Sequence, residues 1–175
     1  GDGELIYRRG RGFIPLSTSD TLDYNGLQYS TVWSVGCPLM CTNCGNSKFI
    51  EYDSGYRRIR HSSPQTIVDE IKRAKSKQPH LSTVNFHDDS FLALPYKQLE
   101  DFAKLYKQEV NIPFAVGGVI PNYVREDKIA LLVDAGMNRV RMGIQSGSDN
   151  ILQFYKRPTK LHRIKEATEI LNKFD

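Results

Sequence analysis

The chain has 175 residues, of which 39% are hydrophobic, and it carries 24 lysines and arginines against 20 aspartates and glutamates. This length supports one hydrophobic core rather than two domains. The net charge of +4 is compatible with an anionic substrate, but no dense basic block indicates nucleic acid as a partner. No apolar run approaches the roughly 18 residues of a membrane span, so we expect no membrane partner, and the free cysteines indicate a reducing cytoplasm.

The N-terminal part lacks the periodicity of a folded element. Residues 1–28 contain two glycine-rich patches, so we predict a linker or N-terminal extension with one short strand near residues 5–7. The main domain, residues 29–175, opens with the β-rich segment 27–35, which we predict to be the first strand. Gly36 then turns the chain into a loop, and residues 48–60 are also expected to be loop.

Helix and strand patterns alternate from there on. Ser63 is a suitable N-cap and Pro64 suits the first helical position, so a helix should begin here and end before Pro79. Further strands are predicted at residues 82–87, 113–116 and 139–145, and further helices at residues 95–109, 125–135, 148–154 and 161–174. A strand about every 30 residues with a helix in each gap is typical of a parallel α/β sheet.

The predicted strands are not apolar throughout, as strands covered on both faces would be. Val84 and Phe86 alternate with Asn85 and His87, and the fourth strand alternates in the same way. One face of the sheet should therefore pack on helices while the other face is polar. A curved sheet with helices outside and a ligand-holding inner face satisfies both requirements.

Polar residues and all the cysteines gather where the active sites of such barrels lie, at the C-terminal ends of the strands. Cys37, Cys41 and Cys44 share an eight-residue window and can converge as metal ligands. A structural zinc usually has four ligands, so zinc would need His61 or His87 as well. A four-iron cluster held by three thiolates keeps one iron open. A disulfide between two of the cysteines would leave the third thiol without a partner. An iron–sulfur cluster that serves electron transfer alone would need a fourth ligand from elsewhere in the chain.

The Cys-x3-Cys-x2-Cys motif, placed after a strand and before a βα pattern, resembles the signature of the radical S-adenosylmethionine (SAM) superfamily. Four more stretches resemble it in the same order: Ser63–Pro64, FHDDSF at residues 86–91, GIQSGS at residues 143–148 and YKRPT at residues 155–159. Their pattern is closest to the cobalamin-binding branch and its methylthiotransferase-like relatives. One departure is Asn43, which precedes the third cysteine where the family usually has an aromatic residue, and this affects the packing beside the adenine of SAM.

The resemblance implies a parallel (β/α)6 partial TIM-type barrel, of which about four βα units would be present. We therefore expect a truncated core, without the later strands and without an upstream cobalamin domain. It also implies a [4Fe–4S] cluster on Cys37, Cys41 and Cys44. The open iron would chelate SAM, which is cleaved to methionine and a 5′-deoxyadenosyl radical. Cobalamin is a further cofactor in the cobalamin-binding branch, and flavodoxin or ferredoxin would be the reducing partner.

The same resemblance implies residues that bind SAM. Asp88 or Asp89 would bind its ammonium group. Because neighbouring side chains point to opposite sides, we expect the other aspartate to form hydrogen bonds within a turn. Gln145 and Ser146 would reach the carboxylate or ribose, and Arg157 would bind the carboxylate as a bidentate donor. The simple alternatives are that Gln145 and Ser146 only form the turn at the end of the strand and that Arg157 is a solvated arginine.

Three functions therefore remain open at the level of the sequence. The first is a radical SAM enzyme, including a cobalamin-dependent methyltransferase, with the alternative that the truncated core binds the cluster but turns nothing over. The second is a methylthiotransferase-like or tRNA-modifying radical SAM enzyme. The third is a zinc-stabilised binding module without a reaction. The substrate, small or macromolecular, is not indicated by the residues.

Overall fold

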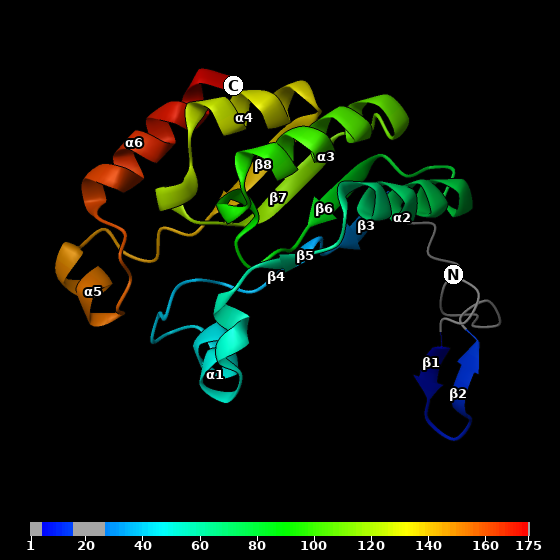
Figure 1. Ribbon diagram of the computed structural model, residues 1–175, viewed down its shortest axis with the longest axis horizontal. Coiled ribbons are helices and arrows are strands. Elements are labelled where there is room, and N and C mark those ends of the chain that lie inside the picture. Colours follow the sequence, from blue (N-terminus) through cyan, green and yellow to red (C-terminus); the bar gives the residue numbers. More distant parts are fainter. Residues whose placement is uncertain (1–4, 16–26, 175) are drawn as a thin grey trace.

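The structure, a computed structural model, describes residues 5–15 and 27–174 (Figure 1). Its centre is a parallel sheet with the strand order β3-β6-β7-β8. The four strands are β3 (Gln28–Thr31), β6 (Thr83–Phe86), β7 (Phe114–Val119) and β8 (Met137–Met142). Each connection between them contains at least one helix, as a parallel pair requires, which confirms the parallel α/β sheet predicted from the alternating pattern.

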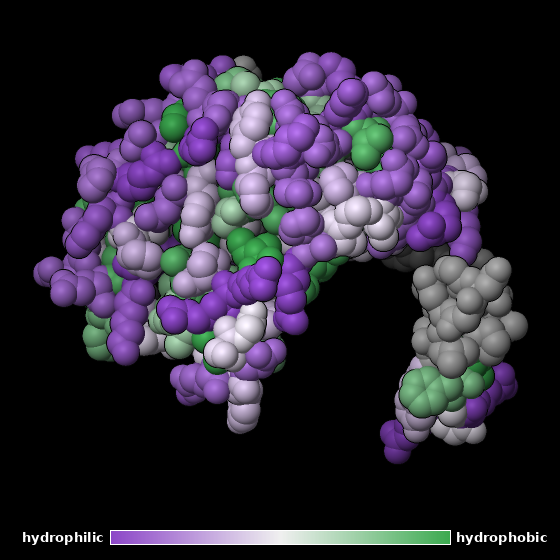
Figure 2. Space-filling view, viewed as in Figure 1, coloured by the Kyte–Doolittle hydropathy of each residue, from purple (hydrophilic) through white to green (hydrophobic). Residues whose placement is uncertain are grey.

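Helices cover one face of this sheet (Figure 1). The helices are α1 (Gly45–Tyr52), α2 (Pro64–Lys77), α3 (Tyr96–Glu109), α4 (Glu126–Asp134), α5 (Asp149–Phe154) and α6 (Leu161–Leu171), with short 3-10 turns η3 (Ser54–Arg57), η4 (Phe91–Ala93), η5 (Pro121–Tyr123) and η6 (Asn172–Phe174). Helices α2, α3, α4 and α6 follow one another along the covered face, and the surface over them is mostly hydrophilic in Figure 2.

The core lies between the sheet and these helices and is rich in aromatic rings. Trp33 is 3% exposed and stacks on Phe102, with ring centroids 4.7 Å apart. Phe102 also contacts Phe86 and Phe114 from the sheet. Aromatic side chains bury large apolar areas, so this cluster fixes α3 against the strands that position the site.

The helix predicted after Ser63 is confirmed in detail. The Ser63 hydroxyl accepts a hydrogen bond from the Thr66 backbone N–H at 3.1 Å, and Pro64 occupies the first turn. Ile67 and Ile71 are buried at helical spacing, so the apolar stripe faces the core. The remaining predicted helices are also present, with ends that shift by a few residues.

The prediction of one strand over residues 27–35 was wrong. Strand β3 ends at Thr31, and β4 (Ser34–Val35) pairs instead with β5 (Arg60–His61) in a separate antiparallel ribbon. The reason is that the backbone N–H groups of Trp33 and Ser34 donate to the carboxylate of Asp88, at 3.2 and 2.6 Å. These donors therefore leave the parallel sheet.

Residues 48–60 are not a loop, as was predicted, because they contain the rest of α1, all of η3 and the start of β5. Helix α1 escapes detection because it buries only Ser47 and Ile50, which leaves no apolar stripe. Its position comes from a polar contact, in which the Ser47 hydroxyl donates to the Cys41 carbonyl at 2.6 Å. A periodicity argument cannot find such a helix.

Strand boundaries differ elsewhere in the sheet. Strand β7 extends to Val119 rather than stopping at residue 116, and β8 spans Met137–Met142 rather than residues 139–145. The chain does not continue as a strand to residue 145, because Gln145 adopts a left-handed backbone conformation, with a φ of +69°, which is uncommon for a residue other than glycine.

The predicted strand near residues 5–7 is confirmed as β1 (Leu5–Arg8), which pairs with β2 (Gly12–Pro15) in a hairpin. Part of the predicted linker, residues 16–26, lies outside the described residues. The division at residue 28 into an extension and a main domain stays a prediction. Within the described ranges, no helix is both long enough and apolar enough to span a membrane.

Candidate functional site

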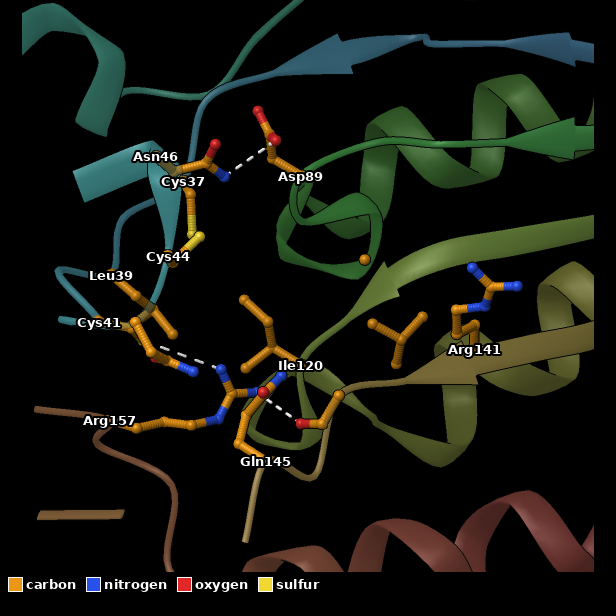
Figure 3. Close-up of a pocket in the computed structure, with 14 residues that line it drawn as sticks. Cys37, Leu39, Cys41, Cys44, Asn46, Asp89, Ile120, Arg141, Gln145 and Arg157 are labelled. Carbon is orange, nitrogen blue, oxygen red and sulfur yellow. Dashed lines mark hydrogen bonds between the residues drawn. The ribbon is translucent and has the colours of Figure 1, made fainter. Parts of the chain in front are cut away.

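A pocket of about 320 Å³ opens at the C-terminal ends of β6, β7 and β8 (Figure 3). Its lining includes the three cysteines together with Asp89, Gln145 and Arg157. Figure 3 shows Arg157 reaching toward Cys41, while Asp89 is bonded to Asn46. Segments that are more than a hundred residues apart in the sequence therefore meet here, as the strand-end argument predicted.

The cysteine loop is held by backbone contacts. The Cys37 N–H donates to the carbonyl of Tyr56 and the Cys44 N–H donates to that of Cys41, both at 3.1 Å. Gly36 permits this approach, because it has a φ of +109° and a Cβ atom there would lie 2.6 Å from a backbone oxygen. Cys37 and Cys41 are buried and Cys44 is exposed, and all three are free thiols. The disulfide interpretation is therefore not realised.

Burial and neighbouring charge act on the first cysteine. Burial raises the pKa of the Cys37 thiol, and the nearby Cys41, Cys44 and Asp89 raise it further, while a backbone hydrogen bond opposes the shift. A cationic group in the pocket would therefore be needed to keep the Cys37 thiolate charged. A bound metal centre would meet that need.

The arrangement of the sulfur atoms bears on which metal centre fits. Among residues 5–15 and 27–174, no three Cys, His, Asp or Glu side chains converge on a single ion. A tetrahedral zinc with Zn–S bonds of about 2.3 Å would hold its sulfur ligands within about 4 Å of one another, whereas a cluster binds each thiolate through a different iron. His61, a candidate fourth zinc ligand, packs instead against Trp33. All three thiols line one pocket, and three thiolates are the ligand number of a cluster that keeps one iron open, whereas a structural zinc usually has four ligands.

The two adjacent aspartates occupy different environments. Asp88 is buried and accepts hydrogen bonds from the Trp33 N–H, the Ser34 N–H and the Ser34 hydroxyl, the last at 2.5 Å. Burial raises the pKa of Asp88, although these hydrogen bonds act in the opposite direction. Gly118 packs directly beneath, where a Cβ atom would lie 1.9 Å from the Asp88 carbonyl oxygen. Asp88 thus attaches the cysteine loop to the sheet.

Asp89, in contrast, lines the pocket and is half-buried. Its carboxylate accepts hydrogen bonds from the Gly36 N–H at 2.9 Å, the Asn46 side chain at 2.9 Å and the Tyr56 hydroxyl at 2.7 Å. Burial, and then the hydrogen bond to Asp89, raise the pKa of Tyr56 to about 12. One carboxylate thus joins β4, α1 and η3 around the site.

The two polar residues after β8 also differ. The Gln145 side chain lines the pocket and lies over Gly143, where a Cβ atom would come within 2.8 Å of the Gln145 amide nitrogen. The Ser146 hydroxyl accepts a hydrogen bond from the Ser148 N–H at 3.1 Å and does not line the pocket. The observed role of Ser146 is in the turn, and its cofactor role stays a prediction.

Arg157 is buried at the base of the pocket. One terminal nitrogen donates to the Gly143 carbonyl at 2.6 Å, and the other lies 3.8 Å from the Cys41 sulfur. The Nε–H is buried and has no hydrogen-bond partner within the described residues. The solvated alternative is therefore not realised.

Several lining residues were not singled out from the sequence. Asn46 lines the pocket, and Tyr56, in the segment 48–60 that was expected to be loop, contacts Asp89 beside it; nothing in their local pattern points to Asp89. Ile120 follows β7 and supplies an apolar wall. Arg141 belongs to the polar face of β8, and the polar and apolar alternation of that strand is the one sequence signal that points to it.

Family membership follows from comparison with known proteins. The sequence profile of the radical SAM superfamily matches residues 31–175. The chain belongs to the radical SAM superfamily. No curated protein sequence matches this radical SAM chain significantly.

Solved structures show a similar fold. The cobalamin-dependent S-adenosylmethionine radical enzyme OxsB, with aqua-cobalamin and SAM bound, gives a TM-score of 0.69 at 21% identity, over 85% of this chain and 22% of OxsB. The radical SAM methyltransferase TsrM from Kitasatospora setae, with tryptophan substrate and a SAM analog bound, gives a TM-score of 0.69 at 17% identity, over 96% of this chain and 32% of TsrM. The radical SAM enzyme HemN from Escherichia coli, a coproporphyrinogen III oxidase, gives a TM-score of 0.58 at 15% identity, over 83% of this chain and 33% of HemN.

These identities are low, so the likeness shows the fold alone. It confirms the prediction of a parallel α/β core that forms part of a radical SAM partial TIM-type barrel. The radical SAM chain spans between 22% and 33% of the length of these three proteins.

Proposed function

We propose that this chain is the cluster-binding and SAM-binding part of a radical SAM enzyme. Cys37, Cys41 and Cys44 would hold a [4Fe–4S] cluster, since thiolates suit iron. The observation that carries the proposal is the single pocket in which three free thiols meet a buried arginine. The chemistry that such a cluster supplies in this superfamily is one-electron cleavage of SAM to methionine and a 5′-deoxyadenosyl radical.

Arg157 is the proposed ligand of the SAM carboxylate. Its buried Nε–H lacks a partner among the described residues, and such a group costs about 1–3 kcal/mol. A carboxylate oxygen in the pocket would remove that cost and add a charge-assisted hydrogen bond. The guanidinium also lies beside the Cys41 sulfur, so a carboxylate bound to it would be close to the cysteine ligands.

Asp89 and Gln145 would hold the other polar groups of SAM. An ionised carboxylate has about four acceptor sites, and Asp89 uses its oxygens for three donors within the chain. The ammonium group of SAM could take a further site. The Gln145 amide would reach the ribose or the carboxylate, while Ser146 and Asp88 would position the turn and the loop on which these residues stand.

We extend the proposal to cobalamin, to methyl transfer and to a flavodoxin or ferredoxin as reducing partner. The sequence pattern and the fold likeness to OxsB and TsrM support the cobalamin-binding branch. Because the chain covers 22% and 32% of those proteins, these activities are proposed for the protein that contains this core. A cytoplasmic location would keep the thiols reduced.

Anaerobic reconstitution with iron and sulfide tests the cluster. We expect broad visible absorbance, bound iron and sulfide, and 5′-deoxyadenosine when SAM and a strong reductant are added. Cys37→Ala, Cys41→Ala and Cys44→Ala should each lose the absorbance. Thr42→Ala, an exposed position in the same loop, should keep it. A colourless protein that binds one zinc would overturn the proposal in favour of the binding module.

A second experiment tests the SAM site on the reconstituted protein. Arg157→Gln should weaken SAM binding by about tenfold or more, since a hydrogen bond between charged groups contributes about 1.5–3 kcal/mol. Arg157→Lys should recover only part of the loss because it cannot bind a carboxylate in bidentate fashion. Lys165→Gln, exposed on α6, is the matched control. Normal SAM binding by Arg157→Gln would refute this assignment and leave the cluster assignment intact.

A further inference from the structure

A second pocket, of about 390 Å³, lies on the face of the sheet opposite the buried core. Side chains from alternate positions of all four strands line it. The register places Ser30 beside Asn85, Asn85 beside Ala115, and Ala115 beside Arg139, so that one row crosses the sheet. This is the polar inner face that the alternation of the strands predicted.

The floor of this pocket is made of small residues, and its two walls carry different side chains. Ala115 and Gly117 on β7 leave space above the middle of the sheet. On the β6 side the wall carries Asn85 and His87, and the Asn85 amide donates to the Gln28 side chain at 3.0 Å. On the β8 side the wall carries Arg139 and Arg141. A ligand on this floor would meet hydrogen-bonding groups on one side and positive charge on the other.

The positive charge is not balanced from within the described part of the chain. No aspartate or glutamate lines the pocket, and neither Arg139 nor Arg141 has a hydrogen bond or ion pair there. A neutral, apolar ligand would strip water from two guanidinium groups without replacing it, which is costly. A ligand with an oxyanion would supply the missing partner.

The two arginines are also suitably spaced. They stand two positions apart on one face of a strand, so their Cα atoms are about 7 Å apart. Guanidinium groups bind carboxylates and phosphates with paired hydrogen bonds. Arg141 lines the cysteine pocket as well, so the two pockets adjoin at this residue. An anionic group held here would direct the rest of its molecule toward the cysteines.

We propose that Arg139 and Arg141 bind a carboxylate or phosphate group of the substrate on the inner face of the sheet. This inference rests on the proposed function, because it assigns the anionic end of the molecule on which the radical chemistry would act. The class of substrate is therefore a small acid or phosphate ester with its reactive carbon at some distance from the anionic group.

The test measures anion binding by calorimetry on the reconstituted protein, with inorganic pyrophosphate and succinate as separate probes at low salt. At least one probe should bind, and which one binds distinguishes phosphate from carboxylate. Arg139→Gln and Arg141→Gln should each weaken binding by about tenfold. Arg139→Lys should lose less, because the charge remains. Arg73→Gln, exposed on α2, removes the same charge outside the pocket and should bind like the wild type.

The outcomes separate this inference from the proposed function. Failure of both probes to bind would overturn the inference, and so would equal loss in Arg73→Gln and Arg139→Gln. If the wild type cleaves SAM while Arg139→Gln and Arg141→Gln bind both probes normally, only the anion pocket is refuted. If both variants lose binding in a protein that cannot cleave SAM, the pocket is supported and the proposed function fails.

Discussion

Replacement of Asp88 by alanine should destabilise the protein and loosen the cysteine loop. The carboxylate is 3% exposed and accepts three hydrogen bonds from Trp33 and Ser34. Each hydrogen bond to a charged group contributes about 1.5–3 kcal/mol, and each buried donor left without an acceptor costs about 1–3 kcal/mol. The cost of burying the charge opposes these contributions, so we expect a net loss of about 3 kcal/mol in the free energy of unfolding.

The asparagine variant separates the shape of the side chain from its charge. In Asp88→Asn the amide oxygen can still accept both hydrogen bonds from Ser34. The amide nitrogen would face the Trp33 N–H, which is also a donor, so one hydrogen bond is lost. We expect a loss of about 1–2 kcal/mol. Urea unfolding under reducing conditions, followed by circular dichroism, measures both variants. Asp101→Asn on α3, which removes only a pair with the exposed Lys97, should change the free energy by less than about 1 kcal/mol.

The pH dependence gives a further check with a definite sign. Because the pKa of Asp88 is raised in the folded protein, the folded state binds this proton more tightly than the unfolded chain does. The resulting stabilisation is fully present below the ordinary carboxyl pKa of about 3.9 and is lost as the pH rises through the raised pKa. The stability difference between wild type and Asp88→Asn should therefore narrow as the pH rises above about 4.

Two results would refute this reasoning. If Asp88→Ala unfolds at the same urea concentration as the wild type, the three hydrogen bonds do not hold the loop. If the difference between wild type and Asp88→Asn widens as the pH rises, the hydrogen bonds outweigh burial and the pKa is lowered instead.

Other substitutions test the packing and the backbone. Gly118→Ala should lower Tm in thermal unfolding by about 5–10 °C, because Gly118 has a φ of +62° and a Cβ atom there would lie 1.9 Å from a backbone oxygen; an unchanged Tm would contradict the contact. Phe102→Ala should cost about 3–5 kcal/mol in urea unfolding, because its ring contacts five others, whereas Tyr96→Ala on the same helix, 38% exposed, should cost less than about 1 kcal/mol. Gln145→Gly should raise the free energy of unfolding by about 0.5–1 kcal/mol by relieving a left-handed backbone and yet weaken SAM binding in calorimetry. A less stable glycine variant would show that the conformation is not strained.

Local signals explain which parts of the fold could be predicted. Helix α2 has a capping serine, a proline in its first turn and an apolar stripe, and these agree with one another. Helix α1 has none of them: its N-cap is Cys44, which makes no side-chain capping bond. The break in the first strand depends on Asp88, more than fifty residues away, and no window around residue 33 contains that information.

The same division holds for the site. The cysteine motif and the edge of the sheet at which it lies could be predicted because spacing and the direction of the chain determine them, although the last residues of β7 and β8 could not. The sequence does not predict which of Asp88 and Asp89 faces the pocket, because this depends on the path of β4 and on the space above Gly118. The contacts of Asn46 and Tyr56 with Asp89 depend on a helix and a turn that the sequence pattern does not reveal.

Trp33 is the only tryptophan in the chain, and its position makes it an optical reporter of the whole arrangement. Its indole stacks within the aromatic core and donates to the Ser62 carbonyl at 3.0 Å, while its own backbone N–H is bound by Asp88. Intrinsic fluorescence at this one residue should therefore respond both when the core melts and when the cysteine loop detaches. A loop that opens before the core unfolds would then give two emission transitions in one titration, without any introduced label.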